Sequence, residues 1–262
     1  MRPKLSATIM TLNEEQRIRK CLESIRWADE IVVLDSRSTD GTVEICREFT
    51  DKIFTEIHPS PAARRARAME LTENEWVLSM DADEFLSPEL AKGIQELLES
   101  PDLDRCNAYR IPRTTYCLGR WIRHGSWYPN YQTRLTKKSC TEVIDNIPHD
   151  IMEVSGRMGK LRHDLMHEPP DRVTDQLRKS DIGSRIFADG KFERGSHACA
   201  AGIFFHGFWR FVRNYVIKRG FLDGTPGLII AILGGVNAFS KQAKLWELEH
   251  VGPPETPDER TK

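Results

Sequence analysis

The sequence predicts an α/β fold: a Rossmann-like, mostly parallel sheet flanked by helices, followed by a helical C-terminal extension. Short apolar runs alternate with stretches of helical periodicity, which is typical of parallel sheets. One such run, residues 76–80, ends in two carboxylates, Asp81 and Asp83. Because ligands of open α/β sheets bind outside the carboxyl ends of the strands, the same pattern also predicts where the site lies.

The expected elements follow in β/α order. We expect strands at residues 5–10, 30–35, 52–55 and 76–80, and helices at residues 42–49 and 61–71. Another helix is expected to begin at Asn13, as its N-cap, with Gln16 reaching back in a capping box. This helix would bury a periodic apolar stripe made of Ile18, Cys21, Leu22, Ile25 and Trp27. Asp35 and Asp81 would then end strands on the same edge of the sheet.

Composition limits the function classes. The chain has 262 residues and a net charge of -1, which argues against nucleic acid as a partner because phosphate binding requires a basic excess. Six scattered cysteines lack metal-ligand spacing and predict free thiols in a reducing compartment. The first strand follows residues 1–4 directly, so we expect no signal peptide and a cytoplasmic protein. Residues 251–262 are proline-rich and charged, and we expect disorder there.

The Asp-x-Asp pair predicts a metal-chelated nucleotide. Hard divalent cations take oxygen ligands and are commonly held by one or two carboxylates plus substrate phosphates. The alternative is a turn or a helix cap, which the same residues often form.

Three motifs resemble the signatures of family 2 glycosyltransferases, which have the GT-A fold: TLNEE at 11–15, VLDSRSTDGT at 33–42 and DADE at 81–84. Further segments resemble the branch that contains lipopolysaccharide core β-1,4-glucosyltransferases. These are WADEIVV at 27–33, LGRWIRHG at 118–125, WYP at 127–129, KRGFLDG at 218–224 and AKLWEL at 243–248. The resemblance covers about residues 4–248 and implies an inverting, metal-dependent transferase that uses a UDP-sugar, with glucose as the expected sugar.

The resemblance implies a donor site lined by Thr11, Asn13, Glu14, Asp35, Arg65, Asp81, Ala82 and Asp83. Asp35 would bind the nucleobase, although it could instead be a turn residue that bonds nearby amides. Arg65 would lie near the diphosphate and Asp81 near the ribose, whereas Glu84 would orient the loop. Where the family usually has Asn after the arginine, this chain has Ala66.

Mg²⁺ or Mn²⁺ is the cofactor that the resemblance implies, with Asp83 as a ligand. A second protein ligand is expected at His167, with His163 as the competing candidate. Imidazole suits Mn²⁺ better than Mg²⁺.

An inverting transfer needs a carboxylate base, which should come from the second half of the chain. Asp150 is the expected base and Asp145 the alternative; Asp150 could also cap a following turn. The family usually has His-Glu at this position, whereas this chain has His149 and Asp150.

The acceptor is expected to be a membrane-anchored glycolipid. Residues 116–134 are rich in aromatics and cations that could line a sugar cleft, although Asn130 replaces the usual Asp of the branch. Residues 200–250 mix aromatic and basic side chains, which predicts an interfacial segment on the cytoplasmic face of the inner membrane. The apolar stretch 226–239 is short of the about 20 residues needed to span a bilayer. A helix that covers the sheet edge, or a homodimer contact, remains the alternative.

The expected organisation is a transferase domain at 1–199, with a nucleotide-binding half at 1–113 and an acceptor half at 114–199. A helical, interfacial segment at 200–250 and a disordered tail at 251–262 would follow. A polyprenyl-linked or capsular acceptor is a rival within the class. A nucleotidyltransferase is a rival from another class, but it would need a glycine-rich loop after the first strand, and the sequence has none there. An inactive sugar-nucleotide-binding module would lack Asp81, Asp83 and Asp150.

Overall fold

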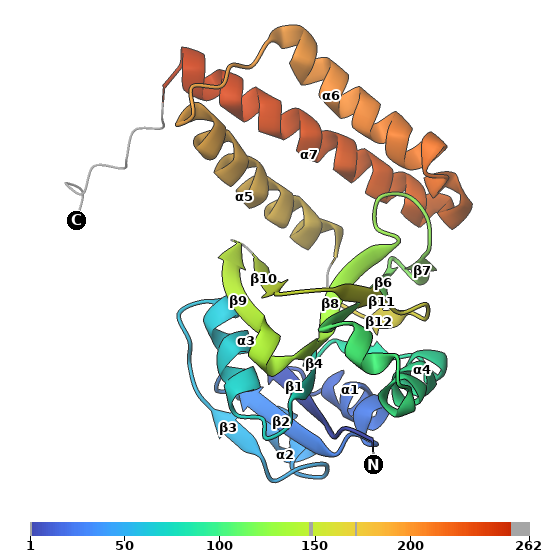
Figure 1. Ribbon diagram of the computed structural model, residues 1–262. Helices are drawn as coiled ribbons and strands as arrows, with labels where there is room; N and C mark the ends of the chain where they lie inside the picture. Colours follow the sequence, from blue (N-terminus) through green and yellow to red (C-terminus); the bar gives the residue numbers. More distant parts are fainter. Residues whose placement is uncertain (1, 147–148, 171, 253–262) are drawn as a thin grey trace, which may run out of the picture. The chain divides into compact units, whose positions relative to one another are not determined.

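The computed structural model describes residues 2–146, 149–170 and 172–252. The chain forms two compact units, one of residues 1–116 and 128–169, the other of residues 117–127 and 170–262 (Figure 1). We call them the sheet unit and the helical unit. Residues 117–127 and 170–199 thus group with the C-terminal helices, and the expected domain boundaries at 113 and 199 remain predictions.

The expected nucleotide-binding half is a parallel β/α arrangement. Its strands are β1 (Leu5–Thr11), β2 (Glu30–Asp35), β3 (Ile53–Thr55) and β4 (Trp76–Asp81), in the sheet order β3-β2-β1-β4. The intervening helices are α1 (Ile18–Ile25), α2 (Thr42–Cys46) and α3 (Pro61–Glu70). β1 and β2 are buried along their whole length, as expected for apolar strands of a parallel sheet covered on both faces.

The second half of the sheet unit adds antiparallel strands. The order continues from β4 through β8 (Asn130–Lys137), β6 (Ala108–Cys117) and β12 (Leu165–His167) to β5 (Glu84–Leu86), and β11 (Met158–Lys160) pairs with β6. Helix α4 (Pro88–Glu99) follows β5. The short 3-10 helices η1 (Leu103–Arg105) and η2 (Lys138–Cys140) precede β6 and follow β8. A separate hairpin, β9 (Thr141–Asn146) and β10 (His149–Val154), packs on α3.

The register brings the strand ends together. Thr11 pairs with Asp35 between β1 and β2, and Met10 pairs with Asp81 between β1 and β4. The predicted common edge for Asp35 and Asp81 is therefore confirmed, because three adjacent parallel strands end at the same level.

Two local predictions were wrong. Asn13 does not cap a helix: it has a φ of +55°, and α1 begins at Ile18 after a turn. Helix α2 ends at Cys46, so residues 47–49 form turns. By contrast, α3 begins as expected, with Ser60 Oγ accepting the Ala63 amide at 3.1 Å.

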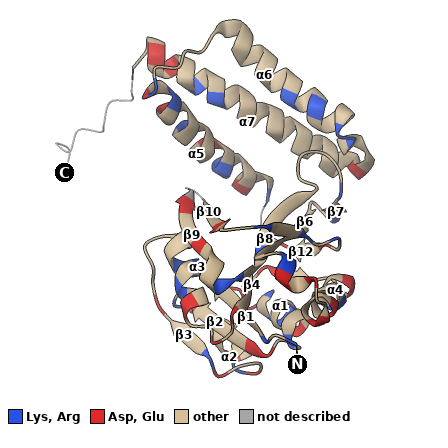
Figure 2. Cartoon of the chain, in the orientation of Figure 1, with Lys and Arg blue, Asp and Glu red and all other residues tan. Residues whose placement is uncertain are grey.

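The helical unit consists of α5 (Val173–Phe192), α6 (Ala200–Val212) and α7 (Gly224–His250), with a π-helical turn η3 (Arg213–Ile217), the 3-10 turn η4 (Gly220–Asp223) and the short strand β7 (Arg120–Ile122). Helix α7 packs against both α5 and α6. A Cβ at Gly235 would lie 3.0 Å from the Gly207 carbonyl, so glycine permits this close crossing. Figure 2 colours the positions of Lys and Arg along these helices blue.

The expected length of the C-terminal apolar segment needs correction. By length and composition, the helical stretch Gly220–His250 is long and apolar enough to cross a membrane, the only such stretch in the described part of the chain. This property alone does not establish a span, since core helices share it. The expected disorder of the tail falls on residues 253–262, which lie outside the described residues.

Candidate functional site

The loops after β1 and β2 are held together by hydrogen bonds. The Asn13 amide donates to Ser38 Oγ at 2.9 Å, and Asn13 Oδ1 accepts from the Thr39 amide at 2.8 Å. The carboxylate of Asp35 accepts from the amides of Arg37 and Ser38, each at 3.0 Å. Asp35 thus makes the hydrogen bonds to nearby amides that were expected if it is a turn residue. Its contact with a nucleobase stays a prediction.

Thr11 and Glu14 lie on this same edge. Thr11 is buried, and its hydroxyl has no hydrogen-bond partner among the described residues. Burial raises the pKa of Glu14; the neighbouring Arg17 opposes this, and repulsion from the Asp83 carboxylate adds to it. Ala82 lies in the hydrophobic core, which leaves only its backbone for a ligand.

Asp83 and His167 face one another. Asp83 Oδ2 lies 3.3 Å from His167 Nε2, and Thr115 Oγ1 lies 3.2 Å from the other ring nitrogen. A ring nitrogen held by a second polar group is typical of metal-binding histidines. The competing His163 is exposed and lies against Gly93 of α4.

The donor set at this place fits a divalent cation bound together with a substrate. No group of three or more His, Cys, Asp or Glu residues is arranged to hold a metal within the ranges that the structure describes. A carboxylate and an imidazole would therefore leave most coordination positions to phosphate oxygens and water, which is how Mg²⁺ is commonly bound.

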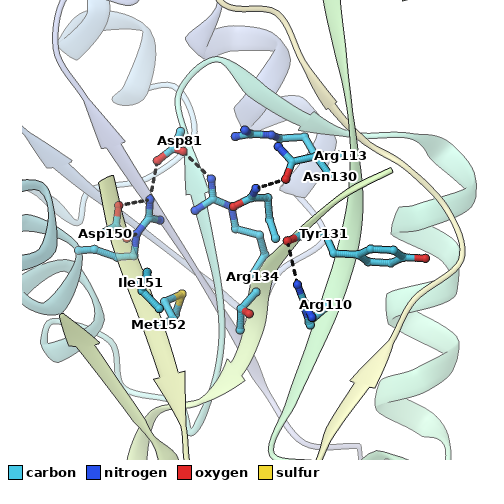
Figure 3. A pocket seen from close by; sticks show the side chains of 12 residues that line it. Asp81, Arg110, Arg113, Asn130, Tyr131, Arg134, Asp150, Ile151 and Met152 are labelled. Atoms are coloured by element: carbon cyan, nitrogen blue, oxygen red, sulfur yellow. Dashed lines mark hydrogen bonds and ion pairs between the residues drawn. The ribbon is translucent and has the colours of Figure 1, made fainter. Parts of the chain in front are cut away.

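A cavity of about 460 Å³ opens beside Asp81 (Figure 3). Its lining contains four guanidinium groups and two carboxylates: Arg65, Arg110, Arg113, Arg134, Asp81 and Asp150. With four cations against two anions, the cavity favours an anionic ligand.

Arg65 is 3% exposed and joins the two carboxylates of the cavity. Its Nη2 donates to Asp81 Oδ1 at 2.9 Å, its Nη1 donates to Ser79 Oγ at 2.8 Å, and its Nε donates to Asp150. One guanidinium from α3 thereby holds a carboxylate from β4 and another from β10.

Arg134 holds Asp81 from the other side. Its Nη2 donates to Asp81 Oδ2 at 2.5 Å and to Glu84 Oε1 at 2.7 Å. Burial opposes ionisation of Asp81, but Arg134 and Arg65 outweigh it and hold the pKa of Asp81 well below its usual range. Both oxygens of Asp81 are thus paired with arginines, and its predicted ribose contact remains untested.

Glu84 is fully buried and accepts from the Asp81 amide at 3.2 Å and from Arg113 at 3.0 Å. This geometry fits the orienting role expected of Glu84, because its carboxylate closes the turn that follows β4.

The structure separates the two candidate bases. Asp150 lies inside β10, beside the cavity, and does not cap a turn. Asp145 pairs with it in the hairpin register but is exposed, and its Oδ2 accepts from Ser60 Oγ at 3.0 Å. Only Asp150 of the two lines the cavity.

The aromatic segment 116–134 is divided between the two units. Tyr131 lines the cavity, with Arg110 at 5.7 Å from its ring centroid. Trp127 instead packs in the helical unit, where the His124 amide donates to Asp223 at 2.8 Å. A common lining by the whole segment therefore stays a prediction.

Sequence reasoning missed Arg110, Arg113 and Arg134. Arg134 is buried in β8, and a buried cation needs a carboxylate partner, but this partner becomes apparent only in the folded structure.

One family model matches more than half of the chain. Residues 6–153 match the family model described as Glycosyl transferase family 2. The chain is 29% identical over 250 residues to the lipopolysaccharide core biosynthesis glycosyltransferase LpsC of Rhizobium meliloti, covering 93% of this chain and 92% of LpsC. An uncharacterized glycosyltransferase of Rickettsia bellii is 28% identical over 256 residues, covering 94% and 87% of the two chains. The crystal structure of S. aureus TarS 1-349 in complex with UDP superposes with a TM-score of 0.48 at 15% identity, covering 97% and 93%.

Proposed function

The chain belongs to glycosyl transferase family 2, and on that premise we propose that it moves glucose from a UDP-sugar to a lipid-anchored saccharide such as the lipopolysaccharide inner core. The observation that carries the proposal is the guanidinium of Arg65, held between Asp81 and Asp150 at a cationic cavity. The likeness to a lipopolysaccharide core enzyme supports the acceptor class.

At the donor end, Asp83 and His167 would hold Mn²⁺ or Mg²⁺. When bound, the cation supplies Lewis-acid stabilisation of the departing diphosphate. Thr115 supports this role by fixing the His167 ring through its other nitrogen. Glu14 adds negative charge beside Asp83, which strengthens cation binding at this edge.

Asp150 would act as the base. It takes the proton of the acceptor hydroxyl while the hydroxyl oxygen bonds to the anomeric carbon and the bond from that carbon to the diphosphate oxygen breaks. In the structure, however, Arg65 donates to both oxygens of this carboxylate, so this ion pair must open before Asp150 can take a proton. A diphosphate that competes for Arg65 would release Asp150, so that donor binding prepares the base.

The cavity suits a phosphorylated acceptor, because arginine forks bind phosphate in a bidentate manner. Four arginines line it, and Tyr131 offers an aromatic face for a sugar ring. The same features would accept a polyprenyl-linked or capsular acceptor. The nucleotidyltransferase alternative has no support, since the family match covers the nucleotide half. We place the enzyme on the cytoplasmic face of the inner membrane, where such acceptors are anchored.

Thermal denaturation against a panel of sugar nucleotides tests the donor. UDP-glucose, UDP-galactose, UDP-N-acetylglucosamine, GDP-mannose and ADP-glucose are each added with Mn²⁺ or with EDTA. We expect the UDP-sugars to raise Tm only with Mn²⁺, UDP-glucose most, and Asp83→Ala to abolish the increase. Equal stabilisation by the GDP- and ADP-sugars, or none by any of them, would contradict the proposed donor.

A further inference from the structure

A second cavity lies in the helical unit, lined by side chains of α5, α6, η3 and α7. Its volume is about 330 Å³. Its lining combines three cations with three aromatic rings, and includes no Asp or Glu: Arg210, Arg213, Lys241, Phe187, Phe205 and Trp209.

The three cations have no anionic partner. Across the ranges that the structure describes, no carboxylate forms an ion pair with Arg210, Arg213 or Lys241. Burial, and then repulsion by Arg210, lowers the pKa of Lys241, whose ammonium lies 5.0 Å from the Phe187 ring centroid. Lys241 is half-buried, whereas Arg210 and Arg213 are exposed at the mouth of the cavity. Three like charges gathered around one opening repel each other unless an anion offsets them. The cavity therefore fits a negatively charged ligand.

Helices α6 and α7, which line this cavity, also carry exposed apolar side chains. Four aromatic side chains of α6 are 47–72% exposed: Phe204, Phe205, Phe208 and Trp209. Phe205 stacks on Trp209 with ring centroids 6.5 Å apart, and both also line the cavity. On α7, Ile232, Val236 and Phe239 are exposed as well. Aromatic rings beside basic residues are the composition of helices that lie in the headgroup layer of a membrane.

We propose that this cavity binds the phosphate headgroup of an anionic lipid, with Phe205 and Trp209 inserted at the level of the headgroups. Two guanidinium groups supply the bidentate donors that phosphate prefers, and Lys241 adds a third positive charge from α7. The exposed rings select a lipid over free phosphate, because they gain from acyl contact. Binding at this site requires neither donor nor turnover, so its test is independent of the proposed reaction.

The test is co-sedimentation of the full chain with phosphatidylcholine vesicles, with and without phosphatidic acid. The cavity variant is R210Q/R213Q/K241Q. A matched control, R178Q/R185Q/R194Q, removes the same three charges from exposed positions of the helical unit outside the cavity. With about 1 kcal/mol for each basic residue near an anionic surface, we expect the cavity variant to bind phosphatidic acid vesicles about 100-fold more weakly than the wild type. The control should stay close to the wild type.

Three results would overturn the proposal. Equal weakening of both variants would mean that only net charge matters. Calorimetric binding of inorganic phosphate as tight as vesicle binding would mean that the ligand is soluble. A wild-type dimer that the cavity variant converts to monomer, measured by light scattering, would mean that this face contacts a second copy. Circular dichroism melting of each variant checks folding, and F205Q/W209Q gives a second variant with all three cations intact; it should also bind the vesicles more weakly.

Discussion

Arg65 on α3 and Asp150 on β10 form an ion pair that connects the nucleotide half of the sheet unit to its β9–β10 hairpin. The Nη2 atom of the same guanidinium lies 2.9 Å from Asp81 at the end of β4. Asp150, the base that we propose, and Asp81, at the end of β4, therefore share one buried cation. A substitution of either carboxylate should affect the other.

Removal of Arg65 should destabilise the fold. Arg65→Met leaves Asp150 without its cation and Asp81 with Arg134 alone, so we expect the free energy of unfolding to fall by about 3 kcal/mol, the lower end for a broken buried pair. Arg64→Met is the matched control, because Arg64 is only partly buried and contacts Ser36 Oγ at 3.3 Å. Urea unfolding measures the free energy of unfolding of each variant. Similar losses of stability in the two variants would contradict a special role for Arg65.

Asp150→Asn should stop transfer while UDP-sugar binding stays nearly intact. An amide keeps the shape of the carboxylate but cannot take a proton, so kcat should fall by at least about 100-fold, the usual contribution of a general base. Asp145→Asn is the control, since Asp145 is exposed and outside the cavity. If Asp145→Asn alone is inactive, or if Asp150→Asn loses activity through weaker donor binding, the assignment of the base is wrong.

Glu14 gives a pH-dependent prediction. Its pKa is raised chiefly by burial, with Asp83 adding to it against Arg17. A carboxyl with a raised folded pKa contributes most stability below its unfolded pKa of about 4.3 and loses that contribution as the pH rises through the folded value. Glu14→Gln should therefore raise Tm at pH 7, and this gain should vanish below about pH 4. The exposed Glu23→Gln serves as the control. A gain in Tm that does not depend on pH would exclude ionisation of the half-buried Glu14 carboxyl as its cause.

The parallel half of the fold was predictable from sequence because its strands are mostly apolar and end in polar turns. The predicted strand at residues 30–35 matches β2, and the strand at 76–80 differs from β4 by one residue. Asn13 was mispredicted because its capping pattern is local, whereas its side chain accepts from Thr39 in a distant loop. A tertiary hydrogen bond thus replaced the expected cap.

The candidate site was predictable only where family motifs mark it. Asp83 and His167 lie far apart in the sequence and do meet in space, although their binding of a metal stays a prediction. Arg134 and Arg113 were missed because their partner, Glu84, becomes apparent only when β5, β6 and β8 are assembled. A buried charge network has no sequence period, so its members cannot be found by pattern alone.

Calorimetric titration of UDP, with and without Mn²⁺, tests the central claim most directly, namely that Asp83 and His167 hold a cation that binds the donor diphosphate. We expect Mn²⁺ to lower the Kd of UDP for the wild type by at least about 10-fold. This is the factor by which the loss of one residue of a metal site usually weakens metal affinity or activity. Asp83→Ala should remove this gain, whereas the exposed His163→Ala should keep it. Equal UDP affinity with and without Mn²⁺, in the wild type and in Asp83→Ala alike, would contradict the account.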